Sequence, residues 1–148
     1  MIDPNLQNDV EGSEGCKLVS YRDTKNVLTI GWGHELRDQT AQAGALTWTQ
    51  QQADDQLTAD LTAAGVYAAA LPEWSALDTP CRQNALIELC FEMRGRWLPF
   101  KNTRACIQAQ DWQGAHDNLL NSDWANEVHA ARADRIADYL LTGEYPSA

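Results

Sequence analysis

Hydrophobic and polar positions alternate in two short stretches near the start of the chain. In residues 17–22, "KLVSYR", Leu18 faces one side while Val19 and Tyr21 face the other. Residues 23–26, "DTKN", are turn formers, and "VLTIGWG" then alternates again. Two alternating runs around a turn predict a β-hairpin. Residues 35–46 are polar and rich in Gly and Ala, which suits a short loop or a small extra strand.

The residues before the hairpin predict a short helix. Asp3 is a good N-cap, and Pro4 is suited to the first helical position. Leu6 and Val10 would then share one face of a helix over residues 3–12, with Gly12 or Gly15 ending it.

After the hairpin the apolar spacing becomes helical. Thr49 and Gln52 form the Thr-x-x-Gln pattern of a capping box and open a helix over about 49–70. Its apolar face comprises Ala53, Leu57, Leu61 and Ala64.

A second strong helix begins at Thr79, as the cap, and Pro80. Its broad apolar face comprises Ala85, Leu86, Leu89 and Cys90. Shorter helices are expected over about 102–110, 111–120 and 128–142.

These elements predict an α+β fold that is predominantly α-helical, in one domain over residues 1–148. A small β-containing lobe would cover about 13–48, and the helix of about 49–70 would join it to a helical lobe over about 71–148. The helix of residues 3–12 would pack on the helical lobe. Such an arrangement commonly places a ligand site in the cleft between lobes.

Composition and charge narrow the range of functions. A net charge of −10 argues against a protein that binds nucleic acid through its phosphates. The four cysteines lack CxxC spacing, and no histidine lies at metal-ligand spacing, so we expect free thiols, no metal and no cofactor. The first residues lack a basic start and an apolar run, which predicts no signal peptide and folding in a cytosol.

Candidate chemistry concentrates on the hairpin. Glu14 would lie at the negative end of the first helix, where its pKa should be raised, while Asp23 would remain ionised among turn amides. Two carboxyls in unlike surroundings favour glycoside cleavage, with the Thr29 hydroxyl holding an attacking water. Plain helix-end and turn roles are the alternative, and the residues alone leave Glu11 and Glu14 both eligible.

A resemblance to a known family helps to choose between the catalytic and the structural roles of these residues. Residues 14–34 contain the motif elements Glu14-Gly15, Tyr21-x-Asp23 and Thr29-Ile30-Gly31-Trp32-Gly33-His34. This motif is similar to the active-site segment of the T-even bacteriophage lysozymes, the phage-type endolysins of glycoside hydrolase family 24. Looser likeness continues through "LTWTQQQADDQL", "NALIELCFEM" and "ARADRIADYLLTGEY".

The resemblance implies a lysozyme-like two-lobed fold and a muramidase. Such an enzyme hydrolyses the β-1,4 bond between N-acetylmuramic acid and N-acetylglucosamine in peptidoglycan, with inversion. Family spacing selects Glu14 over Glu11 as the acid that protonates the leaving oxygen, while Asp23 and Thr29 position and activate the water.

Further positions match family residues around the substrate. Glu35 and Phe91 are expected in the cleft, and Thr103 and Asn118 on the helical lobe, with a plain structural role as the alternative for each. The match at His34 implies a stabilising ion pair with Asp60 rather than chemistry. Trp112 and Trp124 are expected to pack in the helical lobe.

The chain departs from the family pattern at Glu92, where a polar amide is usual. Glu92 would either raise the pKa of Glu14 by like-charge repulsion or point at a cation. Ser13 replaces an acid that pairs with a buried arginine in some members, so Arg132 or Arg135 needs another partner, and Glu92 is a candidate.

Two other functions remain open at this point. A lytic transglycosylase needs one acid and no activated water, and a wall-binding module of the same fold would have lost turnover. As an endolysin, the protein would be made in the host bacterial cytoplasm and act on the wall in the periplasm after release. It would bind peptidoglycan strands, insert stably in no membrane, depend on a holin if phage-encoded, and be a monomer.

Overall fold

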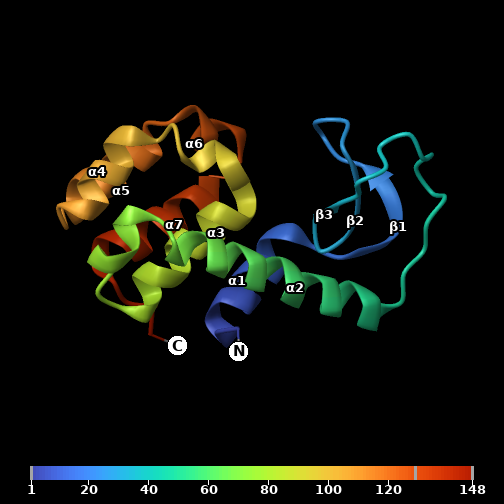
Figure 1. The fold of residues 1–148 in the computed structure, drawn as a ribbon, viewed down its shortest axis with the longest axis horizontal. Helices are drawn as coiled ribbons and strands as arrows, with labels where there is room; N and C mark the ends of the chain where they lie inside the picture. The colour runs from blue at the N-terminus through green and yellow to red at the C-terminus, as the bar shows by residue number, and fades with distance from the viewer. Residues whose placement is uncertain (1, 129, 148) are drawn as a thin grey trace. The chain divides into compact units, whose positions relative to one another are not determined.

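The computed structural model describes residues 2–128 and 130–147. The chain forms two compact units, residues 1–63 and residues 64–148, which are described separately (Figure 1). Among the described residues, no helix combines the length and apolar character needed to cross a bilayer. The expected mixture of a small antiparallel sheet and a majority of helices is confirmed.

The first unit opens with helix α1, Pro4–Glu14. The Asp3 carboxylate accepts a hydrogen bond from Asn5 N at 2.9 Å, so the expected N-cap is present. The expected end at residue 12 is wrong, because Gly12 stays helical and the helix ends before Gly15, which has a φ of 66°. Few residues other than glycine adopt that backbone conformation, and Glu14 therefore becomes the last helical residue.

A three-stranded antiparallel sheet follows, in the order β1 (Lys17–Arg22), β2 (Leu28–Gly31) and β3 (His34–Glu35). The expected hairpin is confirmed. Of residues 35–46, expected as a short loop or a small extra strand, only Glu35 lies in β3, and the rest form turns and loops. Tyr21 pairs with Thr29, but the register shifts between Lys17 and Tyr21. Val19 also forms an isolated antiparallel bridge with Thr47, flanked by hydrogen bonds from Ser20 N to Leu46 O and from Trp48 N to Leu18 O, both at 2.8 Å.

Helix α2, Gln50–Ala69, begins in the first unit and ends in the second. The predicted capping box is formed in both directions. Gln52 N donates to the Thr49 hydroxyl at 3.1 Å, and Thr49 N donates to the Gln52 side-chain oxygen at 2.8 Å. Both interactions satisfy amides that a helix start otherwise leaves without partners.

The second unit surrounds helix α3, Pro80–Met93, whose first turn is capped by the Thr79 hydroxyl. Its other elements are η1 (Pro72–Ala76), η2 (Arg94–Trp97), α4 (Lys101–Gln108), α5 (Trp112–Leu120), α6 (Asp123–Glu127) and α7 (Ala130–Thr142). The largest fully buried side chains of its core are Leu86, Leu89, Met93, Trp97, Ile107, Leu119, Ile136 and Leu140.

The expected last helix, from about residue 128, starts late. Val128 is extended, with φ −98° and ψ 170°, and separates α7 from the short helix α6, which the hydrophobic pattern did not predict.

Both tryptophans expected to pack in the helical lobe do so. Trp124 is buried, and Trp112 packs against the core with the Arg82 guanidinium 4.0 Å from the centre of its ring. Cys81 and Cys90 are buried free thiols, and Cys16 and Cys106 are half-buried ones.

Candidate active site

The Glu14 side chain rests on the turn between β2 and β3. Gly33, with a φ of 76°, lies so close that an added Cβ would be 2.5 Å from Oε2 of Glu14 and 2.9 Å from its Cδ. Any larger residue at position 33 would therefore have to displace the carboxyl group. The end of α1 and the turn around Gly33 together determine where this half-buried carboxyl lies.

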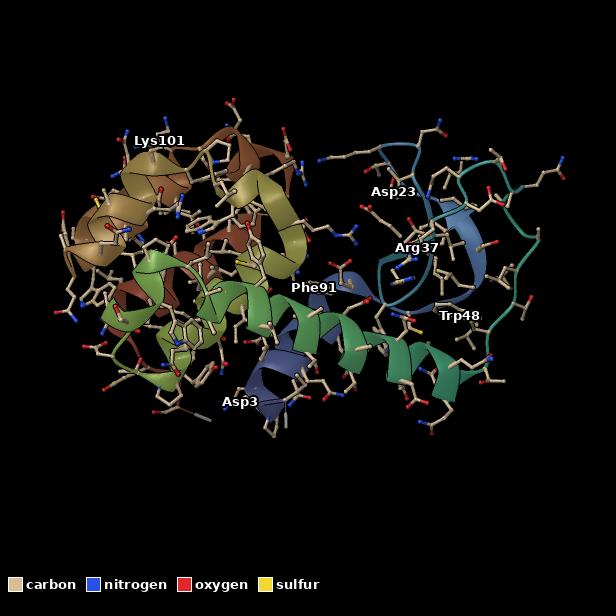
Figure 2. All side chains as sticks on the ribbon, in the orientation of Figure 1. Asp3, Asp23, Arg37, Trp48, Phe91 and Lys101 are labelled. Carbon is tan, nitrogen blue, oxygen red and sulfur yellow. The ribbon has the colours of Figure 1, made fainter. Side chains whose placement is uncertain are left out.

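Asp23 and Thr29 are joined through the backbone of Val27. Oδ1 of Asp23 accepts hydrogen bonds from Lys25 N and Val27 N, both at 2.9 Å. The Val27 carbonyl in turn accepts from Asp23 N at 2.9 Å and from the Thr29 hydroxyl at 2.8 Å. Figure 2 labels Asp23 on the hairpin. The expected turn thus holds both side chains to a single backbone residue.

A row of side chains crosses the sheet at Thr29. Thr29 is the direct partner of Tyr21 on β1 and of Glu35 on β3. Paired residues of an antiparallel sheet point to the same face, with Cβ atoms about 4.5–5.5 Å apart. The sheet therefore brings Glu35, which is exposed, next to Thr29, which is buried.

Tyr21 was identified from the sequence only as part of a motif, and the structure gives it an electrostatic setting. Burial raises the pKa of its phenol, and the nearby charges of Glu14, then Asp23, then Cys16, raise it further. Lys17 Nζ lies 4.2 Å from the centre of the same ring. The Tyr21 phenol is thus close enough to both Glu14 and Asp23 for their charges to act on its pKa.

The residues on either side of Gly33 are tied to acids of α2. His34 Nδ1 lies 2.8 Å from Oδ2 of Asp60, with both side chains about three-quarters buried. Trp32 Nε1 donates to Oδ1 of Asp54 at 2.9 Å, a bond that sequence reasoning missed. No local pattern points to that bond, because Trp32 and Asp54 are 22 residues apart.

The remaining expected substrate residues lie in the second unit. Phe91, labelled in Figure 2, is half-buried on α3. Thr103, on α4, is only 3% exposed and so offers a ligand little surface. The Asn118 amide nitrogen, on α5, donates to Gly114 O at 2.8 Å and contacts Cys106 Sγ at 3.6 Å, which leaves its carbonyl oxygen as the group best suited to a ligand.

The partners of the two arginines are now visible. Nη1 of Arg132 lies 3.0 Å from Glu92, so of the two alternatives for Glu92 the contact with a cation is the one observed. The sequence did not indicate Glu88 as a partner: it accepts from Nε of Arg132 at 3.1 Å and from both terminal nitrogens of Arg135 at 2.8 Å.

In the described parts of the chain, no group of three or more His, Cys, Asp or Glu side chains is arranged to hold a metal ion.

Comparison with known proteins identifies the family of this chain. The family model for phage lysozyme matches residues 11–135, which include Glu14 and the whole hairpin. The chain belongs to the phage lysozyme family.

Two proteins named endolysin are similar to this member of the phage lysozyme family. They come from Lactococcus phage c2 and Lactococcus phage phivML3, and each is 29% identical to this chain over 129 residues. The matched region covers 80% of this chain and 53% of each relative. The chain thus spans about half the length of these endolysins.

Proposed function

We propose that this phage lysozyme family member is a peptidoglycan muramidase. It would hydrolyse the β-1,4 bond between N-acetylmuramic acid and N-acetylglucosamine, with inversion, and so lyse bacterial walls. The observation that carries the proposal is the site around Tyr21. There, Asp23 is joined through Val27 O to Thr29, the strand partner of Tyr21, and the Glu14 carboxyl lies against Gly33 in the turn that follows β2.

Asp23 and Thr29 are suited to hold one water molecule. The Thr29 hydroxyl has one hydrogen, which it donates to Val27 O, so its remaining role is that of an acceptor. Both backbone amides reach Oδ1 of Asp23, and within the described residues no hydrogen bond is formed by Oδ2. A water that donates to Oδ2 and to the Thr29 hydroxyl would present its lone pair to the anomeric carbon.

The proposed reaction balances with these groups alone. Glu14 gives its proton to the leaving glycosidic oxygen as the bond to the anomeric carbon breaks. The water oxygen bonds to that carbon from the opposite face while Asp23 takes up the water proton. Proton exchange with solvent then restores Glu14 and Asp23.

We assign Glu35, next to Thr29, and Phe91 and Asn118 of the second unit to substrate contacts, whereas the burial of Thr103 favours its structural alternative. Access of the protein to the wall through a holin, and a monomeric state, belong to the same proposal.

The test is digestion of purified peptidoglycan by the parent, by Glu14→Gln and by Glu11→Gln. Glu11 is the matched control because it lies on the same helix and its carboxylate accepts from the Gln7 side chain at 3.1 Å. Loss of general acid catalysis should lower the rate of reducing-end release by about 10²–10⁴-fold in Glu14→Gln. Glu11→Gln should retain the parent rate.

The products distinguish the mechanisms. Hydrolysis with inversion predicts α-configured reducing ends immediately after cleavage, observed by nuclear magnetic resonance. A Glu14→Gln variant as active as the parent would show that Glu14 is not the catalytic acid. Products ending in 1,6-anhydromuramic acid would identify a transglycosylase, and no cleavage by the parent would leave a wall-binding module.

A further inference from the structure

The turn that supports Glu14 is held from two sides by α2. Gly33 contacts the carboxyl, and its neighbours Trp32 and His34 bind Asp54 and Asp60 at 2.9 Å and 2.8 Å. The His34–Asp60 pair was expected from the sequence, whereas the Trp32–Asp54 bond was not. Since both bonds flank Gly33 directly, the position of Gly33 depends on both.

Asp54 also reaches the other chain segment beside Glu14. Its Oδ1 accepts from the Gln50 side-chain amide at 2.9 Å, and the same amide nitrogen lies 3.6 Å from Sγ of Cys16. An amide nitrogen carries two hydrogens, so Gln50 is able to make both contacts at once. Asp54 therefore connects the turn under the Glu14 carboxyl with the segment that leaves α1 just after Glu14.

The Trp48 side chain packs against residues that flank the turn. The Trp48 ring lies against Gly31, where an added Cβ would be 3.1 Å from it, and its centre is 5.8 Å from that of the His34 ring. Trp48 is itself held by its backbone bond to Leu18 O at 2.8 Å. The Trp48 ring thus packs near Gly31 and His34, and the Trp32–Asp54 hydrogen bond holds the turn at Trp32.

We propose that Trp32 and Asp54 are positioning residues for the reaction. Their hydrogen bond holds the turn so that Gly33 places the Glu14 carboxyl where it protonates the leaving oxygen. This inference rests on the proposed function, in which Glu14 is the acid. A misplacement of about 1 Å in a reacting group is able to slow a reaction about 10²-fold, so a bond that only restrains the turn should matter by about tenfold.

Three substitutions test whether activity depends on the Trp32–Asp54 hydrogen bond or on the negative charge of Asp54. Trp32→Phe keeps an aromatic ring but removes the donor. Asp54→Leu removes the acceptor, whereas Asp54→Asn keeps an acceptor oxygen and removes the negative charge. Asp55→Leu is the matched control, because Asp55 is an exposed neighbour on the same helix whose carboxylate accepts from Gln51 at 2.7 Å.

The experiment measures kcat, KM and the pH dependence of kcat/KM on solubilised peptidoglycan strands. Thermal unfolding is measured alongside for every variant. Trp32→Phe and Asp54→Leu should lower kcat about tenfold with little change in KM, and the double variant should lose no more than either single one. Asp54→Asn should restore kcat with the pH profile of the parent, and Asp55→Leu should match the parent.

Unchanged kcat in Trp32→Phe and Asp54→Leu would overturn the inference. So would an Asp54→Asn variant as impaired as Asp54→Leu with a displaced pH profile, since the charge would then be the active feature. If Asp54→Leu fails to fold, Trp32→Phe and Asp54→Asn carry the test by themselves. Activity in Glu14→Gln would instead refute the proposed function, so the two failures are distinguishable.

Discussion

One carboxylate of the first unit and two of the second have different kinds of partner. In the first unit, Asp23 accepts hydrogen bonds from the neutral backbone amides of Lys25 and Val27. In the second unit, Glu73 and Glu88 accept from guanidinium groups and are almost fully buried, at 0% and 1% exposure.

Glu73 shows the second arrangement most clearly. Its Oε2 accepts from Nε of Arg104 at 2.6 Å and from Nε1 of Trp97 at 2.8 Å, and Nη2 of Arg104 donates to Oε1 at 3.0 Å. Burial raises the pKa of Glu73, but the bonds from Arg104 and Trp97 outweigh burial and bring that pKa below its ordinary value. Glu73 is consequently an anion in the native state and links η1 with η2 and α4.

The difference teaches that an acid's partners, rather than its burial alone, indicate its role. A carboxylate bonded to arginine gains its stabilisation by staying charged, and it contributes to folding. Asp23, whose hydrogen bonds among the described residues come from neutral backbone amides, is held in place without a bound guanidinium. On this reasoning, Asp23 is suited to chemistry and Glu73 to structure.

The largest expected effect comes from Asp23→Asn. An asparagine oxygen can still accept from the Lys25 and Val27 amides, so the turn should persist, but the base that accepts the water proton is lost. We expect peptidoglycan hydrolysis to fall by about 10²–10⁴-fold, measured by reducing-end release, with a nearly unchanged unfolding midpoint.

Asp38→Asn is the matched control for Asp23→Asn. Asp38 also lies in the first unit, is exposed, and accepts from Thr40 N at 3.0 Å, so it repeats the local turn chemistry without the proposed role. It should keep the parent activity. Equal losses in both variants would contradict the contrast between the units.

Next in size is the loss of stability in Glu73→Gln. The amide replaces one acceptor oxygen with a donor that faces Arg104 or Trp97, in a fully buried position. Disrupting a buried charge pair commonly lowers the free energy of unfolding by about 3–5 kcal/mol. Urea unfolding followed by circular dichroism measures this, while activity per folded molecule should remain near that of the parent. A Glu73→Gln variant that is stable but inactive would contradict the structural role assigned to Glu73.

The smallest expected effect is the acid sensitivity of the same pair. Because the pKa of Glu73 is lower in the folded protein than its ordinary value of 4.5, its stabilisation is present above that value. It is lost as the pH falls through the lower, folded pKa. The difference in unfolding free energy between the parent and Glu73→Gln should therefore shrink on acidification below about pH 4.5. A constant difference from neutral to strongly acid pH would contradict the charged pairing.

Features that depend on neighbouring residues were predictable from the sequence. The Asp3 cap with Pro4, the capping box of Thr49 and Gln52, and the Thr79 cap all form as expected. Each joins groups within a few residues of one another, so the energy that forms it is encoded locally.

Shorter or shifted elements were not predictable in the same way. Helix α6 and the 3-10 turns η1 and η2 span five residues or fewer, which is too short for an apolar period to be recognised. Helix α1 continued past Gly12 because Gly15, not Gly12, adopts the positive φ that ends it. Both glycines were candidates, and the backbone conformation that separates them is a property of the folded chain.

For the candidate site, the motif located Glu14, Asp23 and Thr29 and placed them on a helix end and a hairpin. It did not indicate that Val27 O joins Asp23 to Thr29, or that Trp32 binds Asp54. The first arrangement needs the hairpin register, and the second needs α2 to lie against the turn.

The sequence by itself therefore determined the order of the elements, their main caps and the residues available for chemistry. Only the tertiary structure decided which distant groups became partners. With 21 acidic residues and 11 Lys or Arg, the sequence allows many ion pairs, and it offers no means of choosing Glu73 with Arg104 or Glu88 with Arg135. Those choices follow from packing, which brings together side chains 31 and 47 residues apart and excludes the water that would otherwise solvate them.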